Sequence, residues 1–192
     1  MPEAQDSELL AAYRAGQVAA LERLVDRYRR PLFGYILNML DTPADADEVF
    51  QEVWLRAIRG LDGYKDKHFL SWLFRIAHNV IVDRFRRRKP VVSIDHEDAN
   101  GHKPAEALAD AGARPSTLVR RSDLSAMVGE AVERLPPEQR EVFLMRVEAE
   151  LPFKEIARIQ NVSINTALAR MHYALAKLRT MLAGEMGGGG KT

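Results

Sequence analysis

Residues 69–89 read FLSWLFRIAHNVIVDRFRRRK, a stretch long enough for about six turns of α-helix, with no helix-breaking residue before Pro90. At 100° per residue, one face of this helix is apolar and carries Leu70, Leu73, Ile76, Ala77 and Val80. A second face carries Trp72, Arg75, Asn79, Asp83 and Arg86, and it leads into the basic run at 84–89. Packing into a core needs only the apolar face. The second face therefore favours a surface that contacts nucleic acid.

Composition excludes several classes of protein and site. The 192 residues are 46% hydrophobic and 29% charged, which is typical of a globular protein, and they include no cysteine. The absence of cysteine excludes disulfides, thiolate metal sites and cysteine nucleophiles. The five histidines show no zinc-type spacing, and no catalytic constellation is visible. We expect no metal, no cofactor and no enzyme activity.

The start of the chain, MPEAQDSELL, is acidic and lacks the apolar core of a signal peptide. No apolar run approaches the roughly 20 residues that span a bilayer. These features predict a cytoplasmic protein without membrane insertion.

Helical periodicity and the absence of strand candidates predict an all-α chain. Helices are expected over residues 6–16, 17–40, 44–60, 69–89, 123–135, 137–148, 152–160 and 163–183, with Pro31 kinking the second or marking a junction. They form two small helical domains, 1–89 and 123–183. Residues 90–122 are rich in proline, small residues and acids, which favours a flexible linker, either a plain spacer or a segment that threads a partner. A short helix is possible at 104–110.

The glycine-rich tail, residues 184–192, is expected to be disordered. Its end resembles the phosphate-binding loop G-x-x-x-x-G-K-[ST], but the first glycine of that pattern would fall on Glu185. A working loop also needs a strand before it. We therefore do not expect nucleotide binding.

Residues 152–177 have the pattern of a helix-turn-helix. Asn161 tolerates the left-handed conformation of the turn, and Ser163 is a good N-cap for the second helix. No acid occurs between Glu155 and Glu185, so the second helix suits a DNA groove, although a helical hairpin that merely packs is the alternative. The residues that could meet DNA are Ser163, Asn165, Thr166, Ala169, Arg170, His172, Tyr173 and Lys177.

Three motifs in order carry a family resemblance: DADEVFQEVWLRA at 45–57, WLFRIAHNVIVDRFRRR at 72–88, and LPPEQREVFL at 135–144 with FKEIA at 153–157. Together they resemble the extracytoplasmic-function (ECF) group of bacterial sigma-70-family sigma factors. The resemblance implies a sigma-2-like domain and a sigma-4-like helix-turn-helix domain. It also implies three kinds of partner: core RNA polymerase through its β′ clamp and β flap, promoter DNA, and an anti-sigma factor.

The resemblance assigns roles to particular residues. Binding to the polymerase clamp is implied for Asp45, Asp47, Glu48, Phe50, Gln51, Glu52 and Trp54. Contact with the −10 element is implied for Lys65, Lys67, Trp72, Arg75, Asn79, Asp83, Arg84, Arg86 and Arg87. The −35 element would meet the second helix of the helix-turn-helix. For Trp54, packing into the domain's own core is an equally open reading. For Trp72, packing into the core is favoured over strand separation by the ring itself.

One motif departs from the family. The recognition helix usually reads G-T-V-[KR]-S-R, whereas residues 165–170 read NTALAR, so Leu168 replaces the usual basic residue. We expect an atypical −35 preference. The competing hypothesis is a stand-alone helix-turn-helix regulator, but the net charge of only +1 speaks against tight binding to DNA without a partner.

Overall fold

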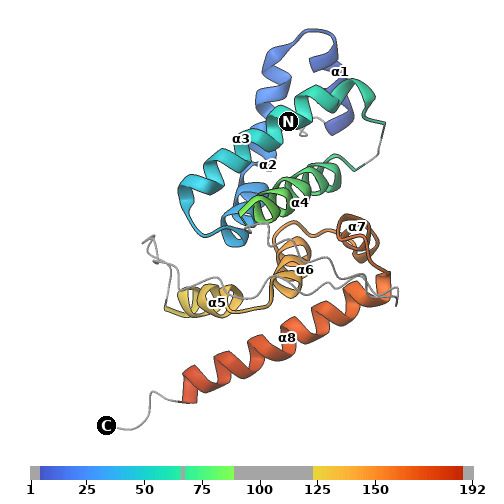
Figure 1. The fold of residues 1–192 in the computed structure, drawn as a ribbon. Coiled ribbons are helices and arrows are strands. Elements are labelled where there is room, and N and C mark those ends of the chain that lie inside the picture. The colour runs from blue at the N-terminus through green and yellow to red at the C-terminus, as the bar shows by residue number, and fades with distance from the viewer. Residues whose placement is uncertain (1–4, 66–67, 89–122, 188–192) are drawn as a thin grey trace.

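The computed structural model describes residues 5–65, 68–88 and 123–187, and the regular structure within these ranges is entirely helical. The helices form two groups, one above the other in Figure 1. The predicted linker, including a possible helix at 104–110, lies outside the described residues, as do Lys67 and residues 188–192.

The N-terminal group contains α1 (Asp6–Arg14), α2 (Val18–Met39), α3 (Pro43–Gly60), the short 3-10 helix η1 (Leu61–Gly63) and α4 (Phe69–Arg88). Gly16 separates α1 from α2 with a φ of +91°, a conformation that favours glycine. The Thr42 side chain begins α3 by accepting a hydrogen bond from the backbone N–H of Asp45 at 3.1 Å. Helix α2 continues through Pro31, so this proline does not end the helix.

The C-terminal group contains α5 (Asp123–Glu133), α6 (Pro137–Val147), α7 (Phe153–Ile159) and α8 (Ile164–Gly187). Between α7 and α8, Asn161 adopts a φ of +53°, as the sequence predicted for the turn. Ser163 then accepts a hydrogen bond from the backbone N–H of Thr166 at 3.0 Å, which caps α8. Helices α7 and α8 therefore form the predicted helix-turn-helix.

The tail begins later than the sequence predicted. Helix α8 continues past residue 183 to Gly187, so residues 184–187 are helical and not disordered. A single glycine at 184 costs a helix only about 1 kcal/mol, and Glu185 and Met186 are good helix formers. The run of glycines from 187 onward is a stronger stop signal than the first glycine alone.

The core of the N-terminal group is rich in aromatic rings. Phe69, Leu73, Phe74, Val80 and Ile81 of α4 are buried, whereas Leu70 and Ile76, which the sequence placed on the core face, are only partly buried. The buried face of α4 is thus rotated, relative to the face that the sequence predicted, toward Phe74 and Ile81. The cause is that α4 packs on both α2 and α3, so the core reaches around more of the helix than one apolar stripe.

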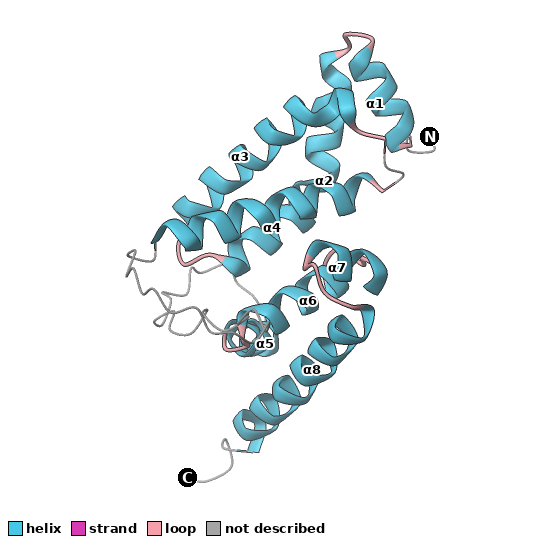
Figure 2. Cartoon of the chain, turned by 45° about the vertical axis from the view of Figure 1, so that its right-hand side comes forward, coloured by secondary structure: helices cyan, strands magenta, loops and turns pink. Residues whose placement is uncertain are grey.

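The two groups pack directly against each other. Helix α2 contacts α6, and α4 contacts α7. Figure 2 shows the two groups from a second direction, with α7 next to α4. The backbone of Gly34 on α2 also lies close to the side chain of Glu148 at the end of α6, since a methyl group added at Gly34 would come within 2.8 Å of the Glu148 carboxylate. The described part of the chain is therefore one closed body.

Candidate nucleic-acid interface

The second face of α4 is available to a ligand over part of its length. Arg75, Asn79, Arg86 and Arg87 are exposed. Trp72 is partly buried: its ring lies 4.8 Å from the ring of Tyr64 and 5.6 Å from that of Phe69, measured between centroids. Trp72 is thus anchored in the domain while part of its surface stays accessible.

Further along α4, the cations pair with acids of α3. Arg84 binds the carboxylates of Asp45 and Glu48, the latter at 2.9 Å, and the hydrogen bond that Arg84 donates to Glu48 contributes most to raising the pKa of Arg84. Arg56 forms ion pairs with two carboxylates, that of Glu52 at 2.6 Å and that of Asp83 at 3.8 Å. Residues that the sequence assigned to DNA and residues that it assigned to the polymerase therefore neutralise one another where α3 crosses α4.

The outward side of α3 differs from the sequence-based expectation in its aromatic residues. Asp47, Glu48 and Gln51 are exposed, but Phe50 and Trp54 are only 8% and 6% exposed. The Phe50 ring packs edge-on against Phe33, with centroids 5.6 Å apart. Of the two readings left open for Trp54, the structure shows packing in the domain's own core.

Sequence reasoning missed Leu55, which is 54% exposed. It lies one helical turn after Gln51, on the same outward stripe as Glu48. A leucine four residues from an exposed amide was a detectable signal, because the buried stripe of α3 runs through Val49, Val53 and Ala57 on the other side. Leu55 gives this polar stripe an apolar centre.

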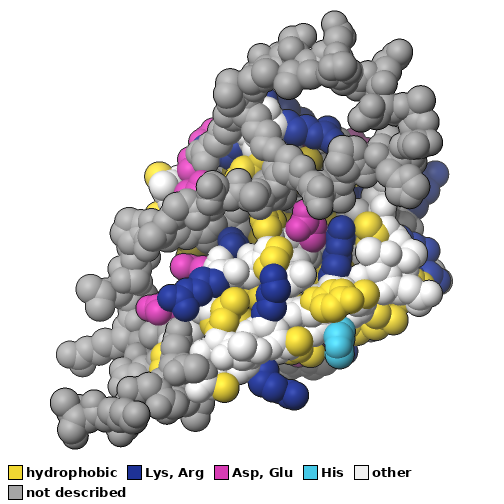
Figure 3. All heavy atoms as spheres, turned by 60° about the horizontal axis from the view of Figure 1, so that its bottom comes forward, with side chains coloured by type: hydrophobic (Ala, Val, Ile, Leu, Met, Phe, Trp, Pro, Cys, Tyr) yellow, Lys and Arg dark blue, Asp and Glu magenta, His cyan; other side chains and the backbone are white. Residues whose placement is uncertain are grey.

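Helix α8 presents the residues predicted to meet the −35 element. Asn165, Thr166, Ala169, His172, Tyr173 and Lys177 are exposed, as is Leu168 at 43%. Figure 3 shows this side of the molecule, on which hydrophobic side chains lie interspersed with Lys and Arg. Arg170 differs from its neighbours: it is partly buried and donates a hydrogen bond to Gln160 Oε1 at 2.9 Å.

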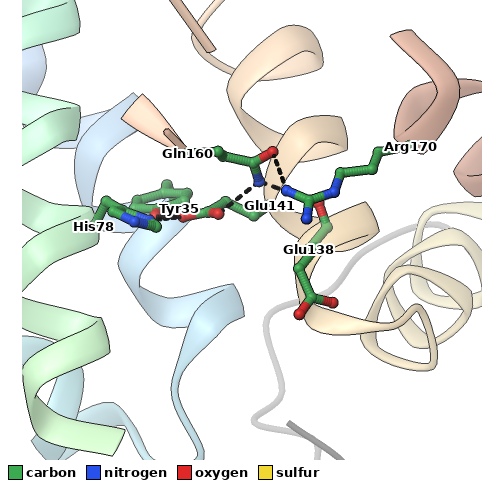
Figure 4. Close-up of polar contacts among 6 residues, drawn as sticks. All are labelled: Tyr35, His78, Glu138, Glu141, Gln160 and Arg170. Atoms are coloured by element: carbon green, nitrogen blue, oxygen red, sulfur yellow. Dashed lines mark hydrogen bonds and ion pairs between the residues drawn. The ribbon is translucent and has the colours of Figure 1, made fainter. Parts of the chain in front are cut away.

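Behind Gln160 lies a polar cluster that joins the two helical groups (Figure 4). Gln160 Nε2 donates to Glu141 Oε2 at 2.6 Å, and the other carboxylate oxygen of Glu141 lies 2.6 Å from both Tyr35 Oη and His78 Nδ1. Tyr35 belongs to α2 and His78 to α4, whereas Glu141 belongs to α6. We call Tyr35, His78, Glu141 and Gln160 the interdomain cluster.

The pKa values in the interdomain cluster shift in opposite directions. Burial disfavours the charged form of His78, but the hydrogen bond and opposite charge of Glu141 outweigh it and raise the pKa of His78. Burial likewise opposes ionisation of Glu141, but His78, Tyr35 and Gln160 together lower its pKa. Burial and the neighbouring carboxylate raise the pKa of Tyr35, so its hydroxyl remains a donor. Glu141 is therefore ionised.

A cavity of about 340 Å³ separates the start of α4 from α7. Trp72 and Arg75 line it from one side, and Glu155, Arg158 and Ile159 from the other. The first helix of the helix-turn-helix thus stands opposite the accessible part of the α4 face.

The described ranges show neither a metal-binding group of side chains nor a helix that could span a membrane. No group of three or more His, Asp or Glu side chains there is placed to hold a metal ion. None of the described helices combines the length and apolar character needed to cross a membrane.

Comparison with known families matches both helical groups. The family described as Sigma-70 region 2 matches residues 24–91, and Sigma-70, region 4 matches residues 125–178. The chain is 30% identical over 173 residues to the ECF RNA polymerase sigma factor SigW of Bacillus subtilis, covering 88% of this chain and 92% of SigW. It is 32% identical over 181 residues to the ECF RNA polymerase sigma factor SigM of Mycobacterium tuberculosis, covering 94% and 86%.

Two solved structures share the fold. CnrH, in complex with the cytosolic domain of CnrY, superposes with a TM-score of 0.65 at 24% identity, covering 93% of this chain and 97% of CnrH. The sigma factor RpoE of Bartonella quintana, in complex with the anti-sigma factor NepR, gives a TM-score of 0.64 at 21% identity, covering 85% and 96%.

Proposed function

The chain belongs to the ECF group of sigma-70-family sigma factors, and we propose that α3, α4 and α8 divide its work between polymerase and promoter. As a sigma factor it is a transcription initiation factor and not an enzyme. The observation that supports the division of work is that each of these three helices presents an exposed stripe of the residues assigned to it.

The outward stripe of α3 would bind the β′ clamp of core RNA polymerase. Asp47, Glu48 and Gln51 can pair with basic and polar groups of the clamp, and Leu55 can insert as the apolar centre of the contact. Interfaces of this kind depend on a few buried apolar anchors surrounded by polar groups. Phe50 and Trp54 would contribute indirectly, because their packing in the core fixes the orientation of α3.

The accessible face of α4 would take the non-template strand of the −10 element. Asn79 can bond the edge of an unstacked base, and Arg75, Arg86 and Arg87 can hold phosphates. An exposed part of Trp72 can stack on a base, a contact worth about 1–3 kcal/mol. Arg84 would support this face by linking α4 to α3.

Helix α8 would enter the major groove at the −35 element. Its N-terminal residues, from Asn165 to Ala169, would face base edges, and Lys177 would reach the backbone. Leu168 stands where the family usually has a basic residue, and an exposed leucine there can contact the C5-methyl group of thymine. We therefore expect an atypical −35 preference.

The remaining assignments follow from this role. Residues 1–89 and 123–183 would be the two working domains, region 4 would also contact the β flap, and the protein would act in the cytoplasm, where the chromosome lies. An anti-sigma factor would hold the free protein. RpoE was crystallised with such a partner, which supports looking for one here.

Run-off transcription with purified core polymerase tests the proposal. The protein plus core should initiate at discrete sites on DNA from its host, and core alone should not. Failure to initiate, while a control sigma factor succeeds on its own promoter, would refute it. Tight gel-shift binding of duplex DNA without core would instead favour the stand-alone regulator.

A further inference from the structure

Glu141 has no part in the three proposed surfaces, yet it is buried in the centre of the molecule with 5% of its surface exposed. A carboxylate that leaves water loses strong hydration, so it remains ionised in a protein only where several donors replace the solvent. Glu141 has three such donors within 2.6 Å. These donors therefore form a site that stabilises a negative charge.

The donors come from two different domains. Gln160 lies at the end of α7, in the same domain as Glu141, whereas Tyr35 and His78 lie on α2 and α4 of the other domain. If the domains separated, Glu141 would lose both donors to one of its oxygens, and the buried Tyr35 hydroxyl would lose its acceptor. In the docked state each member of the interdomain cluster therefore has a partner within the protein, and separation would exchange the bonds across the junction for bonds to water.

We propose that the interdomain cluster is an intramolecular latch that holds the free sigma factor in a closed, self-inhibited conformation. Two further contacts flank the latch at the same junction. Arg140 donates to the backbone carbonyl of Asn38 at 3.3 Å, and the carboxylate of Glu148 lies against Gly34. The closed form therefore combines a charged centre with side-chain contacts to the backbone of α2.

The closed form obstructs the proposed −10 surface. Helix α7 stands across the cavity from Trp72 and Arg75, and places the acidic Glu155 there. A single strand that followed α4 toward its N-terminus would meet α7, where Glu155 is paired with Arg158 at 2.9 Å, so the obstruction is steric. Binding of the −10 strand by Trp72 and Arg75 therefore requires α7 to move away.

The latch also reaches the −35 helix. Gln160 donates to Glu141 and to the Glu138 carbonyl through Nε2, which leaves Oε1 to accept from Arg170 (Figure 4). Arg170 is the basic residue that this recognition helix shares with its family. While the latch is closed, the Arg170 guanidinium is drawn toward Gln160 and the interdomain cluster, so DNA must compete for it.

The physical test uses the full-length chain in the absence of DNA and polymerase. Because the protein has no cysteine, Arg23→Cys on α2 and Ala176→Cys on α8, both exposed, allow a donor and an acceptor dye to report the distance between the domains. We compare the labelled parent with Tyr35→Phe, with Glu141→Gln, and with Glu130→Gln. Glu130→Gln is the matched control, because it removes the same charge from an exposed position of the same domain.

The parent should show high energy transfer, and each latch variant should lower the ratio of closed to open molecules by about tenfold, the factor that corresponds to one lost hydrogen bond to a charged group. The Glu130→Gln control should match the parent. Equal transfer in parent and latch variants, or low transfer in the parent itself, would overturn the proposal. If Glu141→Gln loses helix content by circular dichroism, Tyr35→Phe, which removes a single oxygen atom, decides the outcome.

The inhibitory part rests on the proposed function, and run-off transcription tests it separately. At fixed core polymerase, Tyr35→Phe should reach half-maximal transcription at a sigma concentration up to about tenfold lower than the parent, since more molecules are already open. An unchanged half-maximal concentration in a variant that opens would show that closure does not inhibit. No transcription from any variant would refute the proposed function and leave the energy-transfer result standing.

Discussion

Replacing Leu55 by alanine should weaken binding to core RNA polymerase without affecting the fold. Fully burying a leucine side chain is worth about 1.5–3 kcal/mol. Leu55 is 54% exposed in the free protein, so a partner can still bury roughly half of it, which corresponds to about 1–1.5 kcal/mol. The dissociation constant for core should therefore rise about five- to tenfold. Alanine is a better helix former than leucine, so α3 itself should not suffer.

The assay is a titration of dye-labelled sigma factor with core polymerase, followed by fluorescence anisotropy. Val18→Ala is the matched control, because Val18 is 64% exposed in the same domain but lies at the start of α2, away from the stripe. Circular dichroism should be unchanged for both variants. A dissociation constant of Leu55→Ala within twofold of the parent, or an equal loss in Val18→Ala, would refute the assignment of α3 as the clamp-binding surface.

Three further predictions concern α4, the core and the latch. Asn79→Ala should leave core binding intact but weaken promoter opening by about 1–3 kcal/mol, the worth of one base contact, as measured by reactivity of unpaired thymines; lost core binding would make Asn79 structural. Arg140→Met should lower the free energy of unfolding in urea by about 3 kcal/mol, because buried Arg140 donates hydrogen bonds to the carbonyls of Glu133, at the end of α5, and of Leu135 just beyond it. Arg179→Met, at an exposed site, should have little effect. Closure should also depend on pH. Glu141 raises the pKa of His78, although burial and the charge of Arg170 act to lower it, so the contribution of His78 to closure is complete below about pH 6.5 and is lost as pH rises through the raised pKa. The pKa of Glu141 is lowered, so its contribution is lost only as pH falls through the lowered pKa. Interdomain energy transfer should accordingly fall on the alkaline side in the parent and stay level there in His78→Gln.

Local patterns predicted the helices well, because the signals that begin and end a helix act within a few residues. Thr42 and Ser163 cap α3 and α8 with their own side chains, and Asn161 adopts the left-handed conformation that the turn requires. The predicted end of α8 was wrong for a local reason as well. The single glycine at 184 looks like a stop signal, but only the later run of glycines ends the helix. The all-α class and the sigma-70 family followed from the same local information.

The burial of aromatic residues was harder to predict, because it depends on how many neighbours a helix has. An aromatic pair four residues apart, such as Phe50 and Trp54, looks the same on an exposed stripe as on a buried one. Only the packing of Phe33 and Phe69 against them shows which it is. Leu55 was overlooked although its spacing set it apart from the buried stripe of Val49, Val53 and Ala57, and the structure shows that it is exposed.

By itself, the sequence determined the helices, the family and the residue types on each functional stripe, since all of these arise from periodicity and motifs within single segments. Only the tertiary structure decided which charges are free and which are paired, as with Arg84, Asp45 and Glu48 across α3 and α4. It also decided that Tyr35, His78 and Glu141, the first and last of which are 106 positions apart in the sequence, share one buried charge. The physical reason is that the energy of an ionised group depends on the donors and solvent around it in space, and segment-by-segment patterns do not specify which distant donors those will be.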